Sequence, residues 1–428
     1  MVPVHAACVL LSLAPLLVLG VPPIWTQPEQ VHLSYAGVPG SMIVTWTTFN
    51  KTESIVEYGL LGGRLFEMST KGNATLFVDS GTEKRKLFIH RVTLTGLKPA
   101  ATYVYHCGSD EGWSDVFSFT ALNDSSSFSP RFALYGDLGN ENPQSLSRLQ
   151  KETQLGMYDV ILHIGNLHTD RNDNARIGDE FMRQIQSIAA YVPYMTCPGN
   201  HEATYNFSNY RNRFSMPGQT ESLWYSWNLG SAHIISFSTE VYFYLDFGLD
   251  LLFKQYDWLT KDLEEANKPE NRALRPWIIT MGHRPMYCSD DDQDDCTKFD
   301  SYVSPGLEDL FYHNGVDVEL WAHEHTYERL WPVYGDKVYN GSKEQPYTNP
   351  KAPVHIITGS AGCRERTDRF NPNPKDWSAF RSTDYGYSRM QVVNATHLYL
   401  EQVSDDQYGK VIDSIWVVKE KHGFSAWQ

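Results

Sequence analysis

Positive charge, long apolar runs and internal repeats are all scarce in this chain of 428 residues. The 36 lysines and arginines are outnumbered by 51 aspartates and glutamates, which gives a formal net charge of −15 at pH 7. Nucleic acid and anionic membranes bind clustered Lys and Arg, so neither is an expected partner. No repeat or low-complexity tract is present. The composition, 41% hydrophobic and 20% charged, is that of a folded protein with two or three hydrophobic cores.

One predominantly apolar run stands out, and it lies at the N-terminus. Residues 9–19 form this run, Gly20 offers a small residue for cleavage, and two prolines follow. The pattern is typical of an export signal, although no Lys or Arg precedes the run, and we assign residues 1–20 to a signal peptide. The run is too short to span a bilayer comfortably, so we expect no stable membrane insertion. The expected location is secreted, either extracellular or lumenal.

Cysteine is rare, and its use fits an oxidising compartment. Cys8 would leave with the signal, and an odd number of cysteines would remain, so at least one stays free. Cys288 and Cys296 flank a short acidic loop, and this spacing predicts a disulfide. The sequence leaves open the pairing of the others, Cys107, Cys197 and Cys363. Six glycosylation sequons fit a secreted glycoprotein, and they begin at Asn50, Asn73, Asn123, Asn206, Asn340 and Asn394.

Residues 24–122 have the pattern of a separate all-β domain. Short segments rich in β-branched and aromatic residues alternate with turn clusters. The expected strands are 30–33, 42–48, 54–58, 87–95 and 103–107. This pattern predicts a sandwich of the fibronectin-like kind, followed by a polar linker at 123–127.

From residue 131 onward, expected strands alternate with segments long enough for helical crossovers. The core strands are expected at 132–135, 160–164, 194–196, 234–237, 277–280, 318–321 and 354–358. Two helices are expected from their apolar faces, which carry Ile177, Phe181, Ile185 and Ile188 in one and Leu252, Tyr256, Leu259 and Leu263 in the other. We place this α/β domain at 130–365. Strands within 380–420 are expected to complete it, at the edge of a second sheet packed on the first.

Five times, a short apolar stretch runs into a Gly or Ala that is followed by a residue able to bind metal. These segments are LeuTyrGlyAsp at 134–137, HisIleGlyAsn at 163–166, CysProGlyAsn at 197–200, ThrMetGlyHis at 280–283 and TrpAlaHisGluHis at 321–325. The carboxyl ends of strands in an open α/β sheet converge on one site, and a Gly lets the backbone pass close by. A mixed set of Asp, Asn and His ligands favours a two-metal centre that hydrolyses phosphate esters.

These motifs, in this order, resemble those of the purple acid phosphatases, which belong to the metallophosphoesterase superfamily. The segments at 198–202, ProGlyAsnHisGlu, and 323–329, HisGluHisThrTyrGluArg, are specific signals, and the stretches at 277–289 and 357–363 are most similar to an animal branch. The resemblance also covers the β domain and the C-terminal strands. It implies a βαβαβ metallophosphoesterase domain, Fe and Zn or another divalent metal as cofactors, and a small phosphate ester as substrate.

The resemblance assigns roles to single residues. The metal ligands that it implies are Asp137 and His325 for iron, and Asn200, His283 and His323 for the divalent metal. His201 would hydrogen-bond the phosphate or protonate the leaving group, and Ala322 replaces the usual Gly. Two cations would clamp the phosphoryl group and lower the pKa of a bound water, so that hydroxide exists in acid solution.

The second motif departs from the family pattern. It reads GlyAsnLeuHisThr, so Asn166 stands where the family has a carboxylate that bridges both metals, and Thr169 where it has a tyrosinate on iron. Asn is neutral and offers one useful oxygen, so Asn166 stays among the expected metal ligands but cannot bridge two ions with charge as a carboxylate does. His168 or Asp170 could swing in as a substitute, although a one-residue offset points the side chain elsewhere.

Two readings of function follow from the altered second motif. One is an acid phosphatase that hydrolyses phosphate monoesters with a doubtful iron side. The other is a pseudophosphatase that serves as a binding module. A phosphodiesterase or nucleotidase would differ only in pocket shape, and the sequence leaves the oligomeric state open.

The remaining candidate ligands are interpreted as structural. Five histidines lie within apolar strands, namely His90, His106, His163, His233 and His355. The acidic run at 290–295 lacks the spaced ligands and Gly of a calcium loop, and we interpret it as a solvated loop.

Overall fold

The structure is a computed structural model that describes the chain except for residues 1–22, 168–173, 292–295, 297–300 and 428. The expected signal peptide therefore lies outside the described residues. So do His168, Thr169 and Asp170 of the second motif, and most of the acidic run. Among the described helices, none is long and apolar enough to cross a membrane.

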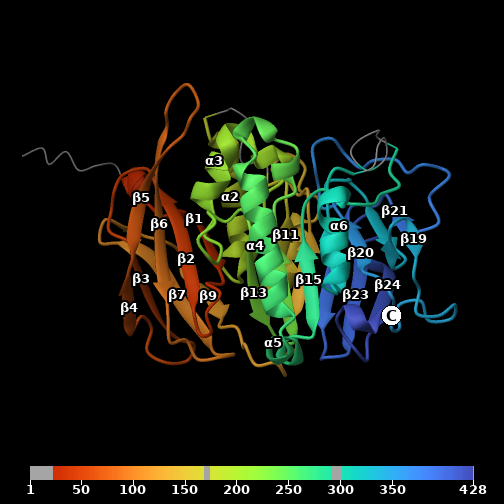
Figure 1. Cartoon of the computed structure of the whole chain (residues 1–428). Coiled ribbons are helices and arrows are strands. Elements are labelled where there is room, and N and C mark those ends of the chain that lie inside the picture. The colour runs from red at the N-terminus through yellow and green to blue at the C-terminus, as the bar shows by residue number, and fades with distance from the viewer. Residues whose placement is uncertain (1–22, 168–173, 292–295, 297–300, 428) are drawn as a thin grey trace, which may run out of the picture.

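The N-terminal part of the chain is an all-β sandwich, on the left in Figure 1. One sheet has the order β1-β2-β6-β5 and the other β4-β3-β7-β8, with β9 paired to β7. The bounds are η1 (Pro23–Trp25), β1 (Glu29–Ser34), β2 (Met42–Thr48), β3 (Ile55–Leu60), β4 (Met68–Lys71), β5 (Asn73–Val78), β6 (Lys86–Leu94), β7 (Thr102–Ser109), β8 (Gly112–Trp113) and β9 (Phe117–Thr120). All five expected strands are present. Four short strands, β4, β5, β8 and β9, were not predicted. The side chains of β4, β5 and β8 are largely exposed or half-buried and give a weak apolar signal, and β9 has only four residues, two of them buried.

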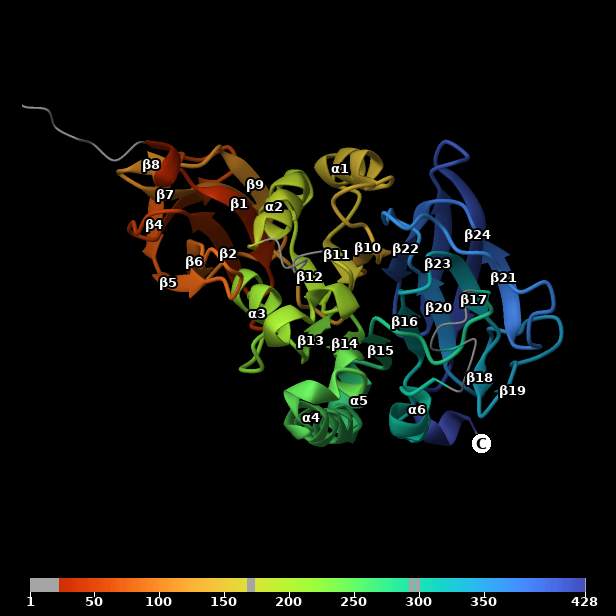
Figure 2. The same cartoon turned by 90° about the horizontal axis from the view of Figure 1, so that it is seen from above.

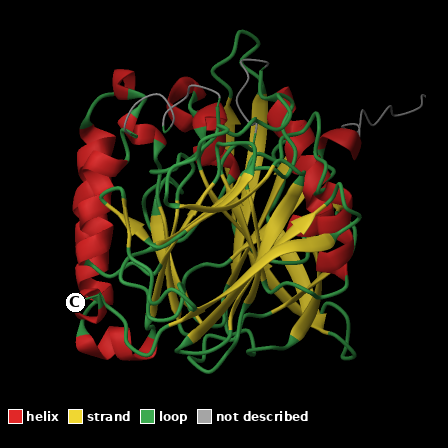
Figure 3. Cartoon of the chain, turned by 90° about the vertical axis from the view of Figure 1, so that its right-hand side faces the viewer, coloured by secondary structure: helices red, strands yellow, loops and turns green. Residues whose placement is uncertain are grey.

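The rest of the chain forms two mixed sheets that pack face to face, as Figure 3 shows. Their orders are β12-β11-β10-β22-β23-β24 and β13-β14-β15-β16-β20-β17-β21. The strand bounds are β10 (Arg131–Tyr135), β11 (Val160–Ile164), β12 (Tyr194–Cys197), β13 (Tyr225–Leu229), β14 (Ala232–Ser236), β15 (Trp277–Met281), β16 (Val318–Trp321), β17 (Tyr327–Leu330), β18 (Val333–Tyr334), β19 (Lys337–Val338), β20 (Val354–Thr358), β21 (Ser378–Ser382), β22 (Gly386–Val392), β23 (His397–Ser404) and β24 (Lys410–Val418). The short strands β18 and β19 pair only with each other.

Helices cover both outer faces of this sandwich, with α1 and α2 on one side and α4, α5 and α6 on the other (Figure 2). Their bounds are α1 (Leu146–Gln154), α2 (Arg176–Ala189), α3 (Thr204–Arg213), α4 (Asp250–Ala266), α5 (Pro269–Leu274) and α6 (Ser304–His313), with short 3₁₀ turns η2 (Asn200–Glu202), η3 (Glu240–Tyr242), η4 (Leu245–Phe247) and η5 (Phe424–Ala426). The predicted fold class, an α/β sandwich behind an all-β domain, is confirmed.

The C-terminal strands extend the sheet that contains β10. Strand β22 pairs antiparallel with β10, with Arg131 opposite Gln391, so β22, β23 and β24 complete the first sheet. They form one edge of this six-stranded sheet, which packs on the seven-stranded sheet, as expected, but their pairing with β10 was not predicted. Pairing between strands about 250 residues apart leaves no local pattern, whereas parallel neighbours joined by a helical crossover do.

The buried face of α4 also differs from the prediction. Its buried residues are Gln255, Leu259, Leu263 and Ala266, whereas Tyr256 is 40% exposed. The Gln255 amide donates to Ser238 O at 2.8 Å and accepts from Ser238 N at 2.7 Å. A polar side chain therefore takes the buried position because it satisfies two backbone groups there.

A buried polar network joins the β sandwich to the helices of the α/β part. Asp179 of α2 accepts from Arg213 at 2.9 Å, from Arg85 at 2.7 Å and from Gln30 at 3.2 Å. Arg213 is itself buried and donates to Gln30 Oε1 at 2.9 Å. Since the buried charges pair across the contact, the two parts are held in one fixed arrangement.

Candidate metal centre

The five motifs meet above the carboxyl ends of strands from both sheets. Asp137 follows β10, Asn166 follows β11, and Asn200 follows β12. His283 follows β15, and the AlaHisGluHis segment follows β16. Asp137, Asn166 and His323 have φ angles of 55°, 54° and 71°. Side chains rarely adopt this left-handed backbone, which costs about 1–3 kcal/mol per residue and is concentrated at functional sites.

Glycines ahead of the motif residues allow the close packing of these turns. A Cβ on Gly165 would lie 2.3 Å from His283 Nδ1, and one on Gly199 would lie 2.4 Å from Asn166 Oδ1. A Cβ on Gly136 would lie 2.2 Å from the Cβ of Ala322. The Ala that replaces the usual Gly is thus accommodated by the glycine of the first motif.

Three of the proposed ligands, those of the divalent metal, converge on one point. His283 Nε2 lies 3.0 Å from Asn200 Oδ1 and 3.2 Å from His323 Nδ1. Ligand atoms of one tetrahedral zinc ion lie about 3.3 Å apart, so this spacing suits a single ion. His283 Nδ1 lies 3.0 Å from Ile164 O and donates to it, which leaves the Nε2 lone pair facing the site. Burial lowers the pKa of His283 well below its usual range, which keeps the ring in the neutral form that binds metal.

His323 has a second neighbour that the sequence analysis did not identify. Arg284 Nη1 lies 3.1 Å from His323 Nε2, and a guanidinium can only donate, so Nε2 accepts and the ring proton sits on Nδ1. Glu240 fixes Arg284 through two contacts of 3.1 Å to Nε. For His323 to bind an ion through Nδ1, this proton must leave that atom. The sequence could have indicated this neighbour, because Arg284 directly follows His283.

On the iron side of the centre, the predicted ligands are hydrogen-bonded to other protein groups. Asn166 Nδ2 donates to Asp137 Oδ1 at 2.6 Å, while Asn166 Oδ1 accepts from the His201 backbone N–H at 3.2 Å. The amide therefore presents a donor, not an oxygen, where the family's bridging carboxylate would face the metals. His325 Nε2 lies 3.6 Å from the same Asp137 oxygen, and its Nδ1 lies 3.1 Å from Arg366 O. The described residues thus fit a divalent ion beside Asn200 but not a second, bridged ion.

Asp137 and His325 carry opposite charges in this arrangement. Burial raises the pKa of Asp137, but His283, His325 and His323 lower it more, and the net shift is downward. Burial lowers the pKa of His325, but the Asp137 carboxylate and Cys363 raise it well above its ordinary value overall. These two shifts are in the directions that favour an ion pair between Asp137 and His325.

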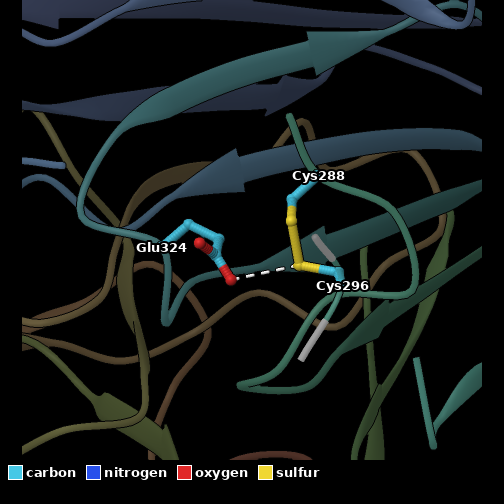
Figure 4. Close-up of side chains that lie close together, drawn as sticks. All are labelled: Cys288, Cys296 and Glu324. Atoms are coloured by element: carbon cyan, nitrogen blue, oxygen red, sulfur yellow. Dashed lines mark hydrogen bonds between the residues drawn. A yellow bond between two sulfur atoms is a disulfide. The ribbon is translucent and has the colours of Figure 1, made fainter. Parts of the chain in front are cut away.

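Cys288 and Cys296 form the predicted disulfide, which is confirmed, and it lies beside the metal-ligand segment. Figure 4 shows Glu324, the residue between His323 and His325, with Oε1 3.1 Å from Cys296 Sγ. Bonded sulfurs are not thiolate ligands, so these three residues are not a metal site. The other cysteines of the described chain, Cys107, Cys197 and Cys363, are free and buried.

The five strand histidines have structural partners, as predicted. His90 lies 2.8 Å from both Thr48 and Ser54 hydroxyls, and His163 lies 2.7 Å from the Tyr194 hydroxyl. The other three contact carboxylate, amide or indole groups, and these are His106 with Glu57, His233 with Asp262 and Asn228, and His355 with Trp321.

Comparison with known proteins places the chain in one family. Family models match as "Purple acid Phosphatase, N-terminal domain" at 28–121, "Calcineurin-like phosphoesterase" at 130–327 and "Iron/zinc purple acid phosphatase-like protein C" at 352–414. Acid phosphatase type 7 of Danio rerio is 72% identical over 418 residues, covering 95% of this chain and 94% of the relative. The Homo sapiens protein of that name is 58% identical over 404 residues, covering 92% of each.

A solved structure agrees with these sequence matches. Purple acid phosphatase PPD1 from yellow lupin seeds has a TM-score of 0.78 and 25% identity, and the match covers 92% of this chain and 75% of that one. The chain belongs to the purple acid phosphatase family. The resemblance read from its motifs is confirmed.

Proposed function

We propose that this chain is a metal-dependent acid phosphatase that hydrolyses phosphate monoesters with one retained divalent site and an altered iron side. One observation carries the proposal. The Asn166 amide donates to Asp137, so hydrogen bonds replace the bridge between two ions, while Asn200, His283 and His323 still converge. In the family, a zinc-type ion held by these three residues neutralises phosphoryl charge and lowers the pKa of a bound water.

The chain's own residues would position the ester and its protons. His201 is half-buried next to Asn200, and its backbone N–H donates to Asn166 Oδ1 at 3.2 Å. From there its imidazole would hydrogen-bond the phosphate or protonate the leaving oxygen. The alternative, a pseudophosphatase that acts as a binding module, draws support from the Asp137–His325 pair, which needs no ion to balance its charge.

Metal analysis with kinetics tests this function. We expect at most one tightly held divalent ion per purified chain, and slow hydrolysis of an aryl phosphate that rises when divalent metal is added. His283→Ala should remove both the ion and the response, because His283 lies at the centre of the converging ligands. A chain that holds no ion and shows no turnover at any metal concentration would leave only the pseudophosphatase reading.

The metal-loaded protein is expected not to be purple. The family's colour arises from charge transfer between a tyrosinate and ferric iron, and the chain has Thr169 at the tyrosinate position. A visible spectrum of the protein after incubation with iron and zinc should show no such band. If a band appears, another tyrosine binds iron, and the alignment of the second motif is wrong.

We also propose that the protein is a secreted glycoprotein, on the basis of its N-terminal run and sequons. Asn73 and Asn394 are exposed on the surface, where a glycan has room. Removal of N-glycans from the protein secreted by animal cells should lower its apparent mass, and Asn394→Gln should lower it by one glycan. An unmodified protein retained in the cytosol would contradict the proposal.

A further inference from the structure

A loop beside the metal centre carries three arginines within six residues. We call residues 364–369, ArgGluArgThrAspArg, the arginine loop; it follows β20 and the GlySerAlaGlyCys turn. Arg364, Arg366 and Arg369 are all exposed. The loop lies outside the five motifs.

The backbone of the arginine loop is fixed to the metal centre at several points. His325 Nδ1 lies 3.1 Å from Arg366 O, and the His325 backbone N–H donates to Asp368 Oδ2 at 2.7 Å. Just before the loop, Asn142 Nδ2 donates to Cys363 O at 2.8 Å, and at its end the Asp291 N–H donates to Arg369 O at 2.6 Å. The arginines therefore project from a backbone that is already ordered, which lowers the entropic cost of binding a ligand.

The loop carries three arginines against Glu365 and Asp368, a formal net charge of +1 in an acidic chain, and its carboxyl-terminal end pairs with the backbone of Asp290 and Asp291. Arg364 forms one exposed ion pair with Glu141, at 3.4 Å. Within the described part of the chain, the guanidinium groups of Arg366 and Arg369 form no ion pair or hydrogen bond. Asp368 is turned toward His325, which leaves Glu365 as the exposed acid of the loop. With a formal net charge of −15 for the whole chain, exposed arginines at this place favour an anionic ligand.

Phosphate is the anion that suits such groups best. Arginine stays charged at every relevant pH, and its planar fork pairs with two phosphate oxygens at once. Arg366 is joined through its own carbonyl to the imidazole of His325, so its side chain starts directly beside the centre that would hold the scissile phosphate. A phosphate at a second position of the same molecule is therefore the anion that matches exposed arginines beside this centre.

We propose that the arginine loop binds a second phosphate group of the substrate, so that the preferred substrates are esters with at least two phosphates. This inference rests on the proposed function for the site of hydrolysis only. Binding of the second phosphate depends on the loop itself and can be measured without turnover.

The test uses the purified protein, with both the β sandwich and the α/β part present, and its Arg366→Gln/Arg369→Gln variant. Isothermal titration with tripolyphosphate and with orthophosphate should show at least about tenfold tighter binding of tripolyphosphate by the unmodified chain. The double variant should lose at least about tenfold in affinity for tripolyphosphate, because two charge-assisted contacts are removed, while its affinity for orthophosphate stays within about twofold. Arg64→Gln, an exposed arginine of the β sandwich, is the matched control and should change neither value.

Kinetics with two sugars that differ by one phosphate add a second readout. In the double variant, KM for fructose 1,6-bisphosphate should rise while kcat for it and KM for fructose 6-phosphate stay unchanged. The inference would be overturned if the unmodified chain bound tripolyphosphate and orthophosphate with equal affinity. It would also be overturned if the double variant bound tripolyphosphate as tightly as the unmodified chain, or lost affinity for both ligands equally. A chain that hydrolyses neither sugar yet needs the arginines for tripolyphosphate would refute the proposed activity and support the loop as a phosphate site.

Discussion

Asn166→Asp is expected to make the stability of the folded chain depend on metal. The variant puts a second carboxylate where the amide now donates to Asp137 at 2.6 Å, and two carboxylates at that distance cannot both ionise without a cation between them. Without metal, we expect a loss on the order of 3 kcal/mol in the free energy of unfolding at neutral pH. A divalent ion at a hundred times its Kd should return about 2.7 kcal/mol. Thermal melts with and without metal measure both changes.

Asn140→Asp is the matched control. Asn140 is also buried, and its Nδ2 donates to a carboxylate oxygen of Glu180 at 3.1 Å. Glu180 is exposed, so the new carboxylate pair should destabilise the fold less than Asn166→Asp does. Added metal should not restore it, because no predicted metal ligand in the described part of the chain is hydrogen-bonded to Glu180. If metal rescues both variants equally, the effect in Asn166→Asp is not specific to the centre.

Activity should follow metal occupancy. Asn166→Asp combined with Thr169→Tyr should bring two ions per chain and raise turnover of an aryl phosphate by at least about tenfold, since even indirect changes around a metal ion commonly cost 10–100-fold. His323→Ala in that background should abolish the gain. An unmodified chain that already holds two tight ions and is as fast as the double variant would rule out the pseudophosphatase reading.

Asp317→Asn is expected to destabilise the whole α/β part. Asp317 is fully buried ahead of β16, and it accepts from Lys419, from Arg272 at 3.3 Å and from His422 at 3.3 Å. Lys419 and His422 belong to the C-terminal segment after β24, so this carboxylate anchors the end of the chain. Removing it leaves the buried Lys419 ammonium without its counter-charge, which costs about 3–5 kcal/mol.

The pH dependence of this effect has a defined sign. Burial raises the pKa of Asp317, but Lys419, His422 and Arg272 lower it more, so the folded pKa lies below the unfolded value of about 3.9. The stabilisation is therefore fully present above that value and is lost as pH falls below it. Denaturant melts should show a constant gap between the two proteins from pH 7 to pH 5 that narrows below about pH 4.

A surface carboxylate provides the control for Asp317. Asp250 and Lys254 form an exposed pair at 3.7 Å on α4, and Asp250→Asn should change stability by less than about 1 kcal/mol. If Asp317→Asn has an equally small effect, the C-terminal segment is not held by this buried pairing.

The architecture and the set of candidate ligands can be predicted from the amino-acid sequence alone. Strands β11, β16 and β20 lie at the predicted residues, because buried parallel strands are short continuous apolar runs that end in Gly or Ala turns. The same pattern predicts that the five motifs meet at the carboxyl ends of the strands. The replacement of the bridging carboxylate by Asn166 can also be recognised from the sequence.

The hydrogen-bond partners of those ligands are known only from the tertiary structure. The amide nitrogen of Asn166 faces Asp137, and Arg284 donates to His323. Both contacts depend on distances between turns that are far apart in the chain. The pairing of β22 with β10 and the burial of Gln255 also depend on contacts between distant parts of the chain. Local patterns specify which face of a strand or helix is apolar, but partners across the fold are set by three-dimensional packing and by the need of each buried polar group for a hydrogen bond.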